Sequence, residues 1–138
     1  MRVPKTLESL VEQGISELSL VSQDSVMWGR DSSEGGFVQL LERLETIAGL
    51  KRMRLMYLHP QGVTPELIDK MLSSDKVASY FDLSLQHISP AVLRGMGRWG
   101  DRRRFEAMID RIRGADPLAA IRTTYILGFP GETDDDAE

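Results

Sequence analysis

The hydrophobic positions along the chain alternate between two spacings. Apolar residues return every three or four positions in several stretches, which predicts helices, and short continuous apolar runs between them predict strands. The predicted strands are residues 17–21, 54–59, 80–86 and 120–127. Because the strands alternate with helices, we expect parallel pairing with right-handed crossover connections.

The helix ends carry capping signals. Thr64 and Ser89 each precede a proline, which places an N-cap oxygen before a residue that suits the first helical position. We expect Gly14 to end the first helix and Gly49 the second. Gly114 and Pro117 should stop the helix marked by Phe105, Met108, Ile109 and Ile112. A glycine- and serine-rich loop is predicted at residues 29–36.

The last residues combine a glycine–proline turn with the beginning of a helix. Thr133 is a suitable N-cap, and Asp136 stands three residues later, but the chain stops two residues after that. An eight-stranded barrel takes about 250 residues. We therefore expect an α/β fold, a partial parallel (β/α) barrel of about four strands with flanking helices, in which residues 1–138 are the central portion. A complete, non-catalytic flavodoxin-like binding module is the competing interpretation.

Composition narrows the possible functions. No segment has the roughly 20 apolar residues of a membrane span, and the N-terminus lacks the apolar segment of a signal peptide, so we expect a cytoplasmic protein without a membrane partner. The absence of cysteine excludes disulfides and iron–sulfur ligation by these residues. The net charge of -4 indicates little about partners, because five of the 21 acidic residues lie in the last seven positions.

Polar or glycine-rich turns follow all four predicted strands. They are Ser22-Gln23-Asp24, His59-Pro60, Gln86-His87-Ile88-Ser89 and Gly128-Phe129-Pro130-Gly131-Glu132. Since parallel α/β folds hold their sites at the carboxyl ends of strands, we expect the site there. The two histidines could bind a metal or act as bases, but we expect structural hydrogen bonding instead. No Lys-Ser or Lys-Thr follows the glycines, which disfavours a nucleoside triphosphate.

Residues 94–113 hold seven arginines against three acidic residues. Such a run usually forms a solvated helix face. A weak contact with RNA or the ribosome is the alternative.

These turns, in this order, resemble a known enzyme family. The segments LVSQDSVMWGRD, YLHP, YFDLSLQHISPAVLRGMGRWG and IRTTYILGFPGETDDD are similar to the radical S-adenosylmethionine methylthiotransferases, and in particular to the branch that modifies an aspartate of a small-subunit ribosomal protein. Gln23-Asp24 and Leu85-Gln86-His87 have the form of this branch, whereas tRNA-modifying relatives typically have Gly-Gln-Asn and Leu-Pro-Val-Gln-Ser-Gly. Ser84 stands where the branch commonly has proline.

The resemblance implies a TIM-barrel-like radical SAM domain that uses S-adenosylmethionine, with 4Fe-4S clusters in the full-length enzyme and no cluster ligands in this chain. It places Ser22-Gln23-Asp24 at the methionyl ammonium, the strand from Arg122 to Glu132 at the adenine, and Gln86-His87 at the ribose or the substrate. Compared with the family's Gly-x-Ile-x-Gly-x-x-Glu strand, Thr124 stands in place of the first glycine. Glu132 lies one residue later than the glutamate of that motif. The candidate cofactor-binding residues are Ser22, Gln23, Asp24, Gln86, His87, Arg122, Thr124, Ile126, Gly128, Gly131 and Glu132.

By the same resemblance, the full-length enzyme attaches a methylthio group to an aspartate of the ribosomal protein, with that protein or the ribosome as its partner. The family's C-x-x-x-C-x-x-C loop and N-terminal domain would precede residue 1, and a C-terminal domain would follow residue 138. We expect the isolated chain to be inactive and to self-associate through unpaired sheet edges. A tRNA adenosine methylthiotransferase of the MiaB type is the alternative enzyme.

Overall fold

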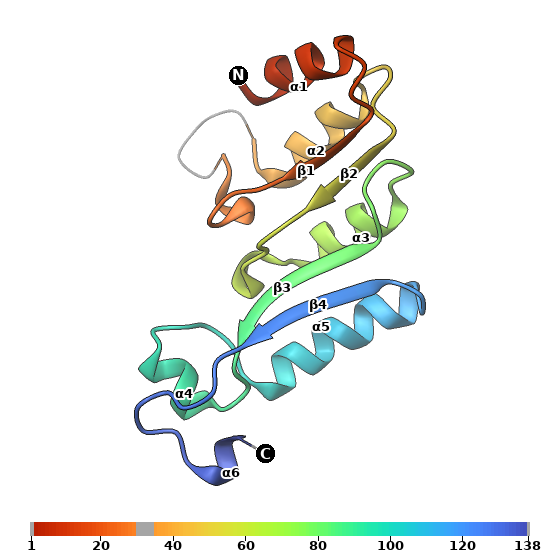
Figure 1. Ribbon diagram of the computed structural model, residues 1–138. Coiled ribbons are helices and arrows are strands. Elements are labelled where there is room, and N and C mark those ends of the chain that lie inside the picture. The colour runs from red at the N-terminus through yellow and green to blue at the C-terminus, as the bar shows by residue number, and fades with distance from the viewer. Residues whose placement is uncertain (1, 30–34, 138) are drawn as a thin grey trace.

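The computed structural model describes residues 2–29 and 35–137 (Figure 1). Most of the predicted glycine- and serine-rich loop, residues 30–34, lies outside them. The helical elements are α1 (Arg2–Glu12), η1 (Ser25–Met27), α2 (Phe37–Glu45), η2 (Pro60–Gly62), α3 (Pro65–Ser73), α4 (Pro90–Gly95), α5 (Arg102–Ala115) and α6 (Asp134–Ala137). The strands are β1 (Glu17–Leu20), β2 (Arg52–Leu55), β3 (Tyr80–Gln86) and β4 (Ala120–Tyr125).

The four strands lie side by side in chain order (Figure 1). β1 pairs with β2 and β3 pairs with β4, both in parallel. Backbone hydrogen bonds join the two pairs: Ala78 N donates to Met53 O at 2.8 Å, and Leu58 N donates to Asp82 O at 2.9 Å. The predicted parallel pairing is therefore confirmed.

The long helices cover one face of this strand layer. α1 contacts α2, α2 contacts α3, and α3 contacts α5, so these helices follow one another over a single face. A flavodoxin-type sheet has a reversed strand order and helices on both faces, whereas a (β/α) barrel adds strands in sequence and keeps its helices outside. The described residues therefore have the arrangement of a partial (β/α) barrel.

The apolar core lies between the strands and this helix layer. Burying one large aliphatic or aromatic side chain stabilises the fold by about 1.5–3 kcal/mol. The largest fully buried side chains are Leu41, Leu44, Met53, Leu55, Leu58, Leu67, Ile68, Met71, Phe81, Leu83, Leu85 and Leu93. Alternate residues of β2 and β3 supply several of them, because successive strand side chains point to opposite faces.

The other face of the strands is polar, and we call it the open face. Its polar residues are Glu17, Ser19, Arg52, Arg54, Tyr80, Asp82, Ser84, Arg122 and Thr124, and Ala120 lies beside Tyr80. In a closed barrel, packed apolar side chains fill the interior. Charged side chains require water or polar partners, so the open face can receive a polar ligand.

Several predicted boundaries need correction. The second predicted strand extends to residue 59, but β2 ends at Leu55 because Tyr57 adopts a left-handed backbone with φ 56°. Gly114 does not end its helix, since it lies inside α5. The helix ends at Ala115, and its C-cap residue Asp116 has the extended backbone (φ -139°, ψ 97°) favoured before proline, here the predicted Pro117.

The predicted helix starts are confirmed. Thr64 Oγ1 accepts a hydrogen bond from Leu67 N at 3.2 Å, and Ser89 Oγ accepts one from Val92 N at 3.5 Å. The final helix begins as α6, where Thr133 and Asp136 form a reciprocal capping box: Thr133 N donates to the Asp136 carboxylate, and Asp136 N donates to Thr133 Oγ1. α4 and α6 both lie beyond the carboxyl ends of β3 and β4 (Figure 1).

Candidate functional site

An open depression of about 510 Å³ lies at the carboxyl ends of the first three strands. It is lined by Val21, Ser22, Gln23, Tyr57 and Ser84. Small-molecule and cofactor sites commonly fall between about 300 and 1,000 Å³. The structure thus brings the predicted residues Ser22 and Gln23 together with two residues that sequence reasoning missed, Tyr57 and Ser84.

Ser25 connects the end of β1 to the end of β2. Its hydroxyl lies 3.0 Å from Ser22 Oγ and donates to Met56 O at 3.1 Å. Between the two serines, Asp24 is half-buried, and its Oδ1 has no hydrogen-bond partner among the described residues. Burying an unpaired carboxylate oxygen is costly, so Asp24 has the chemistry of a group that receives a donor from a ligand.

Tyr57 holds an uncommon backbone conformation at this depression. Its φ of 56° is rare for a bulky residue. Tyr57 N donates to Asp82 Oδ2 at 3.2 Å, which helps to hold the turn, and the side chain remains 45% exposed. The sequence carries no signal for this, because Tyr57 continues an apolar run that suits a strand.

A buried pair joins the end of β3 to the turn that follows β4. His87 Nε2 lies 3.6 Å from Glu132 Oε1, and the two side chains are 3% and 5% exposed. Ser89 N donates to His87 Nδ1 at 2.9 Å, so the proton of the neutral ring is on Nε2 and faces Glu132. Glu132 Oε2 also accepts from Phe129 N at 2.8 Å. His87 therefore makes a structural hydrogen bond, and its role at the site stays a prediction.

The glycine-rich turn after β4 is open on its outer side. Gly128 and Gly131 have left-handed φ values of 77° and 91°, and an added Cβ would meet no atom within 4 Å at either position. Ile126 and Leu127 beside them are 42% and 70% exposed. This exposed apolar backbone segment suits the flat face of an aromatic base.

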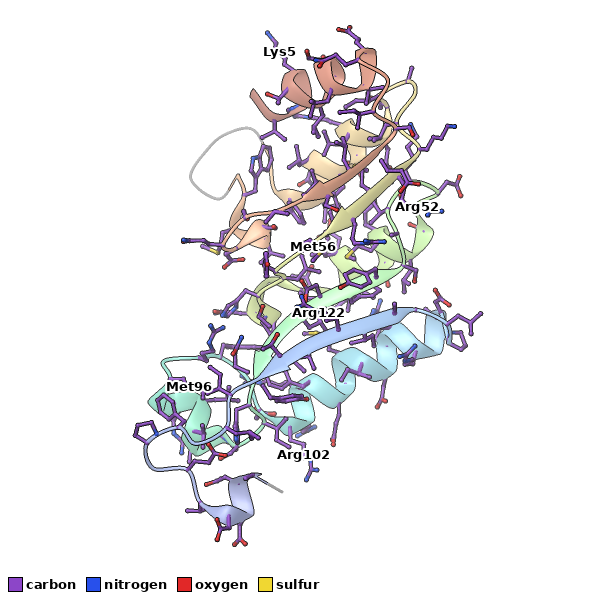
Figure 2. The ribbon with its side chains drawn as sticks, in the orientation of Figure 1. Lys5, Arg52, Met56, Met96, Arg102 and Arg122 are labelled. Atoms are coloured by element: carbon purple, nitrogen blue, oxygen red, sulfur yellow. The ribbon has the colours of Figure 1, made fainter. Side chains whose placement is uncertain are left out.

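The remaining candidate residues lie on β3 and β4. Gln86 has a left-handed φ of 70° at an irregularity of the β3–β4 register, and its carbonyl accepts from Ile126 N at 2.8 Å. Arg122 and Thr124 are on the open face, and Arg122 Nη1 donates to Asp82 Oδ1 at 3.0 Å. Figure 2 shows Arg122 at the β3–β4 pair and Met56 near the end of β2.

Four of the seven arginines between residues 94 and 113 have intramolecular partners. Arg102 pairs with Glu106, Arg104 pairs with Asp101 and stacks on Trp99, Arg111 pairs with Asp69, and Arg113 donates to the carbonyls of Pro117 and Ala119. An RNA contact through this segment stays a prediction.

Within residues 2–29 and 35–137, no group of three or more histidine, cysteine, aspartate or glutamate side chains is arranged to hold a metal ion. In the same ranges, no helix has both the length and the apolar character needed to cross a bilayer.

Comparison with protein families matches residues 2–138 to the Radical SAM superfamily. The chain belongs to this superfamily. Radical SAM proteins use S-adenosylmethionine and a 4Fe-4S cluster, and this chain has no cysteine that could bind a cluster.

Several curated radical SAM proteins are similar over nearly the whole chain. Each is named ribosomal protein uS12 methylthiotransferase RimO. The protein of Streptomyces griseus is 45% identical over 128 residues, 92% of this chain and 26% of the relative. That of Pseudothermotoga lettingae is 44% identical over 131 residues, 94% of this chain and 30% of the relative. That of Saccharopolyspora erythraea is 46% identical over 130 residues, 94% of this chain and 27% of the relative. The chain thus spans between a quarter and a third of the length of these relatives.

The described residues fit S-adenosylmethionine. The ligand has an ammonium group, a ribose diol and an adenine ring, and the strand ends offer an unpaired buried oxygen on Asp24, exposed hydroxyl and amide groups on Ser22 and Gln23, and an open backbone at Gly128 and Gly131. No observation tests the individual contacts, which stay predictions.

Proposed function

We propose that the chain is the central portion of a radical SAM methylthiotransferase of the RimO type, which modifies ribosomal protein uS12. The observation that carries the proposal is the identity of 44–46% over at least 92% of this chain to proteins of that name. The partial barrel with its polar open face agrees with it. The cluster-binding loop and the flanking domains belong to other parts of the enzyme, which acts in the cytoplasm.

The residues of this chain bind and orient the cofactor. Asp24 and Gln23 receive the methionyl ammonium at the end of β1, and the turn from Ile126 to Gly131 covers the adenine at the end of β4. When bound and reduced, S-adenosylmethionine supplies the radical that removes a hydrogen atom from the substrate carbon. The buried pair of His87 and Glu132 acts on the site through the backbone that it holds.

The substrate is the ribosomal protein and not tRNA in this proposal. Gln86-His87 and Gln23-Asp24 have the form of the ribosomal-protein branch, and the relatives above carry uS12 in their names. The exposed edge residues Tyr125 and Leu127 suit a neighbouring segment of the same enzyme, so we expect the isolated chain to self-associate.

The test is a modification assay with the complete gene product. The protein is reconstituted anaerobically with iron and sulfide and mixed with S-adenosylmethionine, a reductant, and either purified uS12 or tRNA. Mass spectrometry of uS12 should show replacement of one hydrogen by one methylthio group at an aspartate. Modification of tRNA with unmodified uS12 would refute the choice of substrate.

A further inference from the structure

Asp82 and Arg122 face each other on the open face, beside the depression. They are register partners on β3 and β4, and Ser84, which lines the depression, is two residues beyond Asp82 on the same face of β3. Side chains at this spacing are about 7 Å apart along a strand. The pair therefore lies next to the space in which a reacting group would sit.

Asp82 holds Arg122 through one nitrogen only. Arg122 Nη1 lies 3.0 Å from Asp82 Oδ1 and 3.1 Å from Oδ2, whereas Nε and Nη2 make no hydrogen bond to any described residue. The Arg122 side chain is 51% exposed, and the Asp82 side chain is 4% exposed. The half-exposed arginine is thus anchored by a buried carboxylate, and its Nε–Nη2 edge has no hydrogen-bond partner among the described residues.

The free Nε–Nη2 edge can bind a carboxylate at both of its oxygens. Nε and Nη2 present two parallel N–H donors that match the two oxygens of a carboxylate. Arg111 uses this same edge in this chain, where Nε and Nη2 donate to Asp69 Oδ1 at 3.2 and 2.8 Å, and Nη2 donates to Oδ2 at 2.7 Å.

The open face carries one more positive than negative side chain. The charged residues of the open face are three arginines and two acids: Arg52, Arg54, Arg122, Glu17 and Asp82. Asp82 accepts from both Arg122 and the backbone N of Tyr57, so its carboxylate is occupied and the edge of Arg122 is not.

We propose that Arg122, which the resemblance groups with the cofactor-binding residues, instead binds the carboxylate of the substrate's aspartate side chain and so selects an acidic residue for modification. The inference rests on the proposed function. The cofactor also has a carboxylate, but its methionyl end is assigned to Ser22-Gln23-Asp24 after β1. Three strand spacings of about 4.8 Å separate β1 from β4, or roughly 14 Å.

The test is a double-mutant cycle with the complete gene product and S-adenosylmethionine, without reductant. Two peptides copy the modified loop of uS12 and differ only in aspartate or asparagine at the target position, and their binding is measured by fluorescence anisotropy. The wild type should prefer the aspartate peptide by about 10-fold or more, as a charge-assisted bidentate contact provides. Arg122→Lys keeps a cation beside Asp82 but loses the two parallel N–H donors of the guanidinium. The preference of this variant for the aspartate peptide should fall below about 2-fold, while its affinity for the cofactor stays unchanged.

Arg111→Lys is the control, because it removes the same pair of N–H donors from an arginine outside the open face. It should keep the wild-type preference for the aspartate peptide. If Arg122→Lys does not fold, Arg122→Gln serves, because its amide still donates to Asp82. A variant that keeps the preference, or that loses cofactor affinity instead, overturns the role of Arg122. A wild type without any preference overturns the proposed substrate itself, and the inference with it.

Discussion

Replacing Glu132 by glutamine tests the buried pair that holds the turn after β4. The carboxylate accepts from Phe129 N and faces the Nε2–H of His87. Glutamine can keep an oxygen on Phe129 N, but its NH2 group then meets the N–H of His87. Two donors would face each other in a site that is 5% exposed at Glu132.

The expected destabilisation follows from these contacts. A hydrogen bond to a charged group contributes about 1.5–3 kcal/mol, and a neutral bond about 1 kcal/mol. Weakening the Phe129 bond and leaving His87 Nε2 unpaired should together lower the free energy of unfolding by about 2 kcal/mol. With a urea m value of about 2 kcal/mol per M, the unfolding midpoint should fall by about 1 M.

The assay is urea unfolding of the 138-residue chain, followed by circular dichroism. Glu8→Gln is the matched control, because Glu8 is exposed on α1 and should change the midpoint by less than about 0.3 M. Equal midpoints for the wild type and Glu132→Gln would refute the reasoning, since they would mean that the pair of His87 and Glu132 does not hold the turn.

Three further predictions concern other parts of the chain. In Gly62→Ala the new Cβ would lie 2.1 Å from Val26 Cγ2, close to Asp24. The substitution should therefore destabilise the fold by about 1–3 kcal/mol and weaken the binding of S-adenosylmethionine. Scanning calorimetry measures the stability, and titration calorimetry measures the binding. The hydrogen bond from Ser79 lowers the pKa of Asp116 below its ordinary 3.8, so its stabilising contribution is present above about pH 4 and is lost as the pH falls through the lowered pKa. Ser79→Ala should therefore reduce the loss of stability between about pH 6 and pH 3, measured by urea midpoints. The isolated chain has no cysteine to bind a cluster, so it should not form deoxyadenosine in catalytic amounts when it is incubated with S-adenosylmethionine, iron, sulfide and dithionite. Chromatography of the reaction mixture measures the deoxyadenosine.

Local patterns in the sequence were enough to predict most of the elements and to indicate the end of the sheet at which we expect the site. Alternating apolar spacings predicted the strands and helices, since burial repeats with the period of each element. The caps at Thr64 and Ser89 depend on groups three residues apart, and such contacts form wherever the local backbone permits. The turns after the strands were recognisable because glycine and polar residues interrupt the apolar runs.

Contacts between residues distant in the sequence were decided only by the tertiary structure. Asp82 and Arg122 meet because the register of β3 and β4 makes them partners across 40 positions, and His87 reaches Glu132 because both strands end at the same edge. The left-handed backbone of Tyr57 shortened β2, and Asp82, 25 positions later, helps to hold it. No local pattern encodes such pairs, because strand register depends on how the whole apolar face packs against the helices.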